Sequence, residues 1–277
     1  RFAPSHQSAI YEIQFGGDGT PQLVVKSNNG SLTVDGNAVS GYEQLGEYAT
    51  KAYIYLEVDQ PVVSQEVNTQ GQSASASLKF ADNVKKLNVR YGISYIDEAQ
   101  AKKNLKREIA SSDLDAVAEK GRQVWNEALG KIEVQGSSEE DKTIFYTSFY
   151  RFYERMICMS EDGRYYSGLD GKVHNDEGIP FYTDDWLWDT YRAAHPLRTI
   201  IEPEKESHMV NSYIRMSEQM EDYWMPTFPE VVGDVRGMNS NHGVAVVADC
   251  YAKGVRGFDL EKAYRACKGA ILSLIHI

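Results

Sequence analysis

Chemistry-bearing side chains are most concentrated in FYTDDWLWDTYRAAHPL, residues 181–197. Two adjacent carboxylates, Asp184 and Asp185, are followed there by Trp186 and Trp188. A carboxylate accepts hydrogen bonds from neighbouring hydroxyl groups, and an indole ring covers the apolar face of a flat ligand. This combination of groups is typical of a monosaccharide pocket.

The same segment also fits an ordinary surface helix. Thr183 or Asp184 would cap its start, and Pro196 would end it. Acids near the start would favour the positive end of the helix dipole, and Asp189 would pair with Arg192 on the helix surface. In that interpretation the tryptophans pack in a core. The residues of this segment leave both interpretations open.

The elements around this segment change in period along the chain. Residues 87–95 alternate apolar and polar side chains, and residues 52–58 form a second β-rich run. Asn28, Asn29 and Gly30 stand between two further β-rich runs and predict a hairpin. Short strands at this spacing indicate an antiparallel β-sandwich over residues 1–97.

After residue 97 the apolar residues recur at helical spacing. Ser112 or Asp113 is a candidate N-cap for the second helix, and Arg155 is expected on the polar face of the third. Residues 98–130 are therefore predicted to form a helical linker, and residues 131–277 a helical domain arranged as a toroid. The predicted helices cover residues 97–110, 112–132, 138–159, 184–195, 204–220, 242–253 and 260–277.

Charge and cysteine usage exclude several classes of partner. The net charge of −11 argues against nucleic acid and anionic membrane surfaces. No apolar run reaches the length of a transmembrane helix, so we expect no membrane insertion. Cys158, Cys250 and Cys267 lack metal-ligand spacing, and an odd number cannot form a closed disulfide set. We expect these three side chains to fill apolar cores.

Four longer blocks stand out in the helical half: WLWDTYRAAHPL, HMVNSYIRMSEQ, WMPTFPE and NHGVAVVADCYAKGVRGFDLEKAYRA. They resemble the catalytic domain of glycoside hydrolase family 92, the calcium-dependent exo-α-mannosidases. Upstream, VSGYEQLGEYATKAYIYLEVDQPV and VRYGISYIDEAQAKKNLKREI are similar to the second half of that family's β-sandwich. The resemblance runs from about Val39 to Ala270. It implies a multi-domain β + α fold, an antiparallel β-sandwich followed by the first part of an (α/α)6 toroid.

The resemblance implies an inverting exo-α-mannosidase that hydrolyses terminal α-1,2- or α-1,3-linked mannose from N-glycans or mannan. Its partners would be mannose-containing glycans, its cofactor Ca2+, and its location the bacterial periplasm or the extracellular space. Inversion needs one protonated carboxyl group and one carboxylate. The resemblance implies that both, and the calcium ligands, lie beyond residue 277. We therefore predict no catalytic or metal-binding residue in this chain, and expect it to be inactive alone.

The resemblance also suggests which residues contact substrate. Asp184 and Asp185 are the candidates for hydrogen bonds to the terminal mannose. Trp186 and Trp188 would line the pocket, with a core position as the alternative for either. His242 would lie near the pocket mouth, with a plain helix-capping role as its alternative.

Two other functions fit the same blocks. A non-catalytic carbohydrate-binding protein of this fold would keep the pocket without the chemistry. Another sandwich-plus-toroid glycoside hydrolase or phosphorylase is the second, and a phosphorylase would need a phosphate site of basic side chains and backbone amides. No Lys/Arg cluster in the sequence stands out for that task. At the end of the chain, we interpret the apolar residues 272–277 as foreign to the family.

Overall fold

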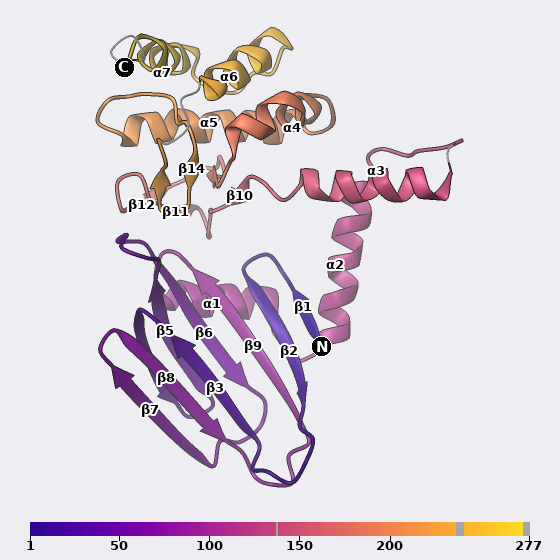
Figure 1. Ribbon diagram of the computed structural model, residues 1–277, viewed down its shortest axis with the longest axis vertical. Helices are drawn as coiled ribbons and strands as arrows, with labels where there is room; N and C mark the ends of the chain where they lie inside the picture. Colours follow the sequence, from indigo (N-terminus) through magenta and orange to yellow (C-terminus); the bar gives the residue numbers. More distant parts are fainter. Residues whose placement is uncertain (137, 237–240, 274–277) are drawn as a thin grey trace. The chain divides into compact units, whose positions relative to one another are not determined.

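The computed structural model describes residues 1–136, 138–236 and 241–273. The chain divides into two compact units, Arg1–Ala128 and Leu129–Ile277. The first unit contains the strands β1–β9 and the helix α1, together with nearly all of α2. The second contains the helices α3–α7 and several short strands (Figure 1).

The first unit is built from two antiparallel sheets. The larger sheet has the order β1 (Phe2–Pro4), β2 (Ser8–Gln14), β9 (Lys86–Ser94), β6 (Lys51–Val58), β5 (Ala38–Gln44), β4 (Gly30–Asp35). The smaller sheet has the order β3 (Gln22–Ser27), β8 (Ser73–Lys79), β7 (Ser64–Gln70).

A hydrophobic core joins the two sheets. Leu32 and Leu56 from the larger sheet belong to the same buried cluster as Ala76 and Leu78 from the smaller one. Leu87 on β9 is part of that cluster and is fully buried. Alternate residues of a strand point to opposite faces, so the predicted alternation along β9 places its apolar side on this core. The predicted antiparallel sandwich is confirmed.

The predicted hairpin at Asn28–Gly30 is wrong. β3 pairs with β8, whereas β4 pairs with β5, so the connection between them passes from one sheet to the other. Turn-forming residues show where a chain changes direction, but they do not fix which strand becomes the partner. In this sandwich the turn joins two layers.

Helix α1 (Glu98–Glu108) covers the other face of the larger sheet (Figure 1). Asp97 caps it by accepting a hydrogen bond of 2.7 Å from the backbone N–H of Gln100. Asn104 is fully buried and donates to the carbonyl of Ile93 at 2.9 Å. These bonds satisfy the polar groups that would otherwise be buried without partners. Helix α2 (Leu114–Leu129) begins after Asp113, which accepts from the backbone of residue 116 at 3.0 Å.

Gly92 sets how closely α1 approaches the sheet. A Cβ atom at this position would lie 2.3 Å from the carbonyl oxygen of Ala101. We expect Gly92→Ala to lower the free energy of unfolding by about 1–3 kcal/mol, because the helix must move away from β9. Gly121→Ala, in the interior of α2 where there is space for a methyl group, is the matched control and should be neutral or stabilising. Urea unfolding of both variants measures the difference, and equal midpoints would contradict the prediction.

In its described residues, the second unit is a helical domain with three two-stranded antiparallel ladders. Its helices are α3 (Glu139–Phe152), α4 (Leu187–Ile201), α5 (Pro203–Gln219), α6 (His242–Ala252) and α7 (Leu260–Ser273). The ladders pair β10 (Ile157–Cys158) with β13 (Tyr182–Thr183), β11 (Arg164–Ser167) with β12 (Lys172–Asn175), and β14 (Pro229–Glu230) with β15 (Gly233–Asp234). Contacts link α4, α5, α6 and α7 to one another (Figure 1). The predicted order of a sandwich followed by a helical domain is confirmed.

The helix expected at residues 184–195 is present, but both of its ends lie further along the chain than predicted. It begins at Leu187, its N-cap is Trp186, and no side chain caps it, so the predicted caps are wrong. Pro196 lies inside the helix, which continues to Ile201. Proline removes one backbone hydrogen bond, but a buried helix face can outweigh that loss.

The predicted ion pair on α4 does not form. Among the described residues, Arg192 donates instead to the hydroxyl of Tyr191 at 3.3 Å, and Asp189 is exposed. The third predicted helix is shorter than expected, because α3 ends at Phe152 and Arg155 lies beyond it. This places the Arg155 side chain in a connecting segment.

The sequence interpretation that residues 272–277 are foreign to the family concerns the end of α7. Residues 272 and 273 belong to that helix, and residues 274–277 lie outside the described residues. Within the described ranges, every helix is too short or too polar to cross a bilayer.

Candidate sugar-binding site

The two adjacent acids lie in a turn between β13 and α4. Asp184 has a left-handed backbone, with φ of 64°. The backbone N–H of Asp185 donates to the carbonyl of Pro229 at 2.8 Å, and the Thr183 hydroxyl donates to the carbonyl of Glu230 at 3.2 Å. Strand β14 therefore anchors the turn on both sides of Asp184. A left-handed aspartate is uncommon and is retained where its surroundings hold it.

Asp184 is partly exposed and has a cationic partner. Nη1 of Arg155 donates to its Oδ1, and both side chains are 27% exposed. The Arg155 guanidinium also lies over the indole of Trp186, 3.9 Å from the ring centroid. A planar cation packs favourably on an indole face. Arg155 therefore joins the acid and the tryptophan into one cluster.

Trp186 and Trp188 belong to a three-ring cluster with Phe228. The two indoles are nearly parallel, with centroids 6.0 Å apart. Phe228 lies 5.9 Å from Trp186 and 4.5 Å from Trp188. Trp186 is 40% exposed, whereas Trp188 is half-buried. The cluster therefore presents Trp186 to solvent and uses the other two rings as support.

Asp185 points in the opposite direction, into the helical core, and is completely buried. Its Oδ1 accepts from the hydroxyl of Thr190 at 2.8 Å. Its Oδ2 lies 2.9 Å from Nε2 of His195 and also accepts from the hydroxyl of Tyr213. Because both of its oxygens accept hydrogen bonds in the core, Asp185 fixes the turn on its buried side, while Asp184 faces outward.

The network around Asp185 extends across two helices. Nδ1 of His195 lies 2.8 Å from Oε1 of Glu206, so its ring is held between two carboxylates. Oε2 of Glu206 lies 3.7 Å from Nη1 of Arg198. Arg198 donates in turn to the carbonyl of Arg155 at 3.1 Å. The buried charges thus continue from the turn to the segment that carries Arg155.

These contacts decide the protonation of the buried groups. Burial opposes a charge on His195, but Glu206 and Asp185 outweigh it and raise the pKa of His195 to about 9. Burial also opposes ionisation of Asp185, yet the hydrogen bonds from His195, Tyr213 and Thr190 lower the pKa of Asp185. Both ring nitrogens of His195 face carboxylates, which requires N–H on each. His195 is therefore a buried imidazolium at neutral pH.

His242 is the first residue of α6, and Asn241 is the N-cap. Its ring stacks on Tyr191 of α4, with centroids 4.1 Å apart and planes at 18°. Burial and the positive charge of Arg192 lower the pKa of His242. The ring is therefore neutral at pH 7, and it joins the starts of α4 and α6. No hydrogen bond within the described residues links it to Asp184.

Sequence reasoning missed the residues that hold this arrangement, Arg155, His195, Arg198, Glu206 and Tyr213. His195 and Arg198 are three residues apart on α4, and Glu206 and Tyr213 are seven residues apart on α5, so each pair shares one face of its helix. Polar side chains at such spacing on a packed helix face indicate a buried network. Arg155 has no comparable signal, because it follows α3 in an irregular segment.

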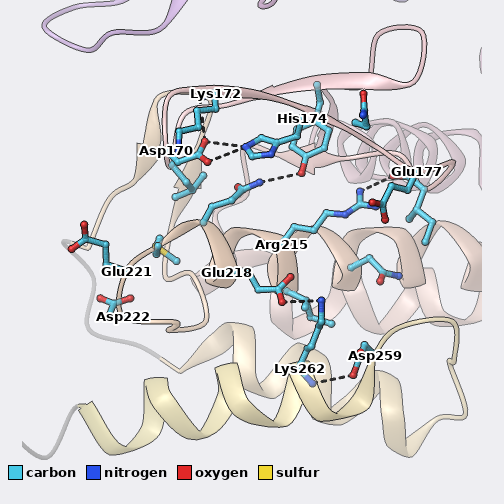
Figure 2. Close-up of a pocket in the computed structure, with 18 of the residues that line it drawn as sticks. Asp170, Lys172, His174, Glu177, Arg215, Glu218, Glu221, Asp222, Asp259 and Lys262 are labelled. Carbon is cyan, nitrogen blue, oxygen red and sulfur yellow. Dashed lines mark hydrogen bonds and ion pairs between the residues drawn. The ribbon is translucent and has the colours of Figure 1, made fainter.

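A separate pocket of about 1200 Å³ lies between the β11–β12 hairpin, α5 and the start of α7 (Figure 2). Its charged side chains are largely paired, including His174 with Asp170 and Lys262 with Glu218. None of the five residues predicted to contact substrate lines it. We place the candidate site at Asp184 and Trp186 because the partly exposed carboxylate and the exposed indole both contact Arg155 there.

The described residues contain no ligand set for the calcium ion that the family resemblance implies. Over residues 1–136, 138–236 and 241–273, no three His, Cys, Asp or Glu side chains converge so as to hold a metal. Calcium would need several oxygen ligands at one point. The residues present do not fit such a site.

Comparison with known proteins supports a family assignment. Residues 100–271 match the family model of the glycosyl hydrolase family 92 catalytic domain. No curated protein sequence matches the chain. A family GH92 inverting mannosidase from Bacteroides thetaiotaomicron is 28% identical, with a TM-score of 0.86 over 96% of this chain and 38% of its own.

Two further solved structures are similar in fold. A family GH92 α-mannosidase from the same organism has a TM-score of 0.86 at 21% identity, covering 97% of this chain and 40% of its own. A protein described as a kojibiose phosphorylase, from the human microbiome, has a TM-score of 0.57 at 14% identity, covering 89% and 37%. The chain therefore spans about two fifths of the GH92 structures that it matches. Its sandwich, its helical domain and the match over residues 100–271 agree: the chain belongs to glycosyl hydrolase family 92.

Proposed function

We propose that the chain is part of an inverting exo-α-mannosidase that removes terminal α-linked mannose, through α-1,2 or α-1,3 linkages, from N-glycans or mannan. The observation that carries the proposal is the turn before α4. There a partly exposed carboxylate, Asp184, is held in a left-handed conformation beside an exposed indole, Trp186. An acceptor for hydroxyl groups next to an exposed aromatic side chain suits a sugar ring.

Each predicted residue has a place in this proposal. Asp184 accepts hydrogen bonds from the terminal mannose, and Trp186 contacts the ring. Trp188 supports the indole of Trp186 from within the three-ring cluster. Asp185 contributes by fixing the turn, because its carboxylate is buried and hydrogen-bonded. His242, which stacks on Tyr191 of α4, would lie at the edge of the site.

Inversion at the anomeric carbon needs two carboxyl groups about 6.5–9.5 Å apart. One donates a proton to the glycosidic oxygen as its bond to the sugar breaks. The other takes a proton from the water that attacks from the opposite face. We place both groups, together with the calcium ligands, in the part of the GH92 structures that this chain does not span. A periplasmic or extracellular location belongs to the same proposal.

Calorimetric titration of D-mannose into the full-length protein tests the role of Asp184. We expect Asp184→Ala to weaken binding by about 10- to 100-fold, since hydrogen bonds to a charged acceptor contribute about 1.5–3 kcal/mol. Asp189→Ala, an exposed acid on α4, is the matched control and should bind as the wild type does. Unchanged binding by Asp184→Ala would remove the turn from the sugar site.

A phosphorylase is the second candidate, because a protein described as a kojibiose phosphorylase is similar in fold. The two activities differ in the nucleophile, which is water in one and phosphate in the other. Cleavage of an α-mannoside by the full-length protein in phosphate-free buffer supports hydrolysis. Cleavage that requires phosphate and releases a sugar phosphate would support the alternative.

A further inference from the structure

Arg155 reaches the candidate site from outside the segment that carries the other residues. It lies 29 positions before Asp184 along the chain. Its Nη1 donates to Oδ1 of Asp184, and its guanidinium carbon lies 3.9 Å from the centroid of the Trp186 ring. One guanidinium therefore contacts both groups that the proposed function assigns to the sugar.

The backbone of Arg155 is held separately from its side chain. Arg198, which is fully buried on α4, donates to the carbonyl of Phe152 at 3.3 Å and to that of Arg155 at 3.1 Å. The Arg198 guanidinium also lies over the Phe152 ring, 4.5 Å from its centroid. These contacts fix where the Arg155 side chain starts. The stack on Trp186 then fixes the plane of its guanidinium.

The pair of Arg155 and Asp184 offers both kinds of hydrogen-bonding group. A guanidinium has five N–H donors in a rigid fork. In the part of the chain that the structure describes, the bond from Nη1 to Asp184 is the only hydrogen bond of the Arg155 side chain, and Oδ1 is the only oxygen of Asp184 that accepts one. The other N–H donors of the Arg155 guanidinium and Oδ2 of Asp184 therefore remain available, side by side, for a ligand. Adjacent hydroxyl groups on a sugar ring match this arrangement, because one can donate while its neighbour accepts.

We propose that Arg155 is a substrate-contacting specificity residue of the sugar site. Asp184 accepts a hydrogen bond from one hydroxyl of the terminal mannose, and Arg155 donates to the adjacent hydroxyl. The inference rests on the proposed function and adds to it a recognition element for two neighbouring positions of the ring. Lysine would not replace Arg155, since it lacks the planar fork and packs less well on an indole.

Binding of D-mannose and its monodeoxy analogues to the full-length protein tests this assignment. We expect Arg155→Met and Asp184→Asn each to weaken mannose binding by about 10- to 100-fold. Arg155→Met should also bind mannose no better than the deoxy analogue that lacks the hydroxyl contacted by Arg155. Asp184→Asn should bind mannose no better than the analogue that lacks the adjacent hydroxyl, the one contacted by Asp184. A residue that only supported the fold would weaken every analogue by the same factor.

Arg256→Met is the matched control, because Arg256 also lies over an aromatic ring, 4.3 Å from the Tyr251 centroid, and donates to backbone carbonyls. It should leave all affinities unchanged. If Arg155→Met does not fold, Arg155→Lys keeps the charge and should still lose the discrimination at that hydroxyl.

Three results separate this inference from the function on which it rests. Unchanged affinity in Arg155→Met, together with weaker binding in Asp184→Asn, would overturn the assignment of Arg155 alone. An equal loss for every analogue would also overturn it, by reducing Arg155 to a structural role. Unchanged binding in both variants would overturn the proposed function as well.

Discussion

Replacing Glu206 with glutamine is expected to lower the free energy of unfolding by about 3–5 kcal/mol. Glu206 is fully buried between the His195 imidazolium, 2.8 Å away, and Arg198. Removing its charge leaves both cations in the core with too little compensation. The glutamine amide would keep one accepting oxygen but would direct its NH2 group at one of these two donors. The loss should therefore exceed that of an ordinary surface change.

Urea unfolding, followed by the fluorescence of the tryptophans in the helical unit, measures this effect. Glu204→Gln is the matched control, because Glu204 is an exposed acid in the first turn of the same helix. It should change stability by less than about 0.5 kcal/mol. A Glu206→Gln midpoint close to that of Glu204→Gln would show that the network contributes little.

Stability should decline by about 3 kcal/mol between pH 6.5 and pH 9 because of His195 alone. Its pKa is raised from 6.5 to about 9 in the folded protein. The folded state therefore keeps a proton that the unfolded chain releases above pH 6.5. The contribution is complete below that pH, falls by about 1.4 kcal/mol for each unit, and is lost above pH 9.

The groups that face His195 do not cancel this change. Asp185 has a lowered pKa and stays ionised across the range, while burial and Asp185 raise the pKa of Tyr213 well above its usual value. Burial likewise raises the pKa of Cys250, which donates to Glu206. Arg198 keeps its charge at any pH in this range. His195 is therefore the group in this network that changes charge.

The measurement is the free energy of unfolding from pH 6 to pH 10 for the wild type and for His195→Gln. The variant should lack the decline between pH 6.5 and pH 9. If the variant does not fold, the His195 ring can be titrated by NMR in the wild-type protein. A ring pKa below 7, or equal slopes in the two proteins, would contradict the prediction.

The periodic part of the fold is predictable from sequence because each element carries its own pattern. The alternation along β9 and the helical spacing along α5 locate both elements to within a few residues. The second face of β9 was not predictable in this way. Asn88 and Ser94 lie on that face and are buried. Polar residues in a strand predict a solvent-exposed face, and the strand's own sequence does not reveal that a helix covers it.

The candidate site, too, is predictable from sequence only in part. The sequence marks Asp184 and Trp186 because their types stand out, but it does not reveal that Asp184 faces outward and Asp185 inward. That difference depends on the left-handed backbone of Asp184 and on two partners of the Asp185 carboxylate, His195 on α4 and Tyr213 on α5, which lie ten and twenty-eight positions further along the chain. Contacts between helices are set by packing, and local propensity does not report them. Pro196 gave a wrong helix end for the same reason.

The position of β9 in the larger sheet has a consequence for synthesis of the chain. β9 lies between β2 and β6, and it pairs Tyr11 with Val89 (Figure 1). Strands β1 and β2 leave the ribosome before β9 does, and the edge of β2 that pairs with β9 stays open until residues 86–94 have emerged. β4, β5 and β6 can pair with their sequence neighbours in the meantime. The nascent chain therefore carries an exposed strand edge from the synthesis of β2 until that of β9, and a chaperone that binds during this interval would prevent pairing with other chains.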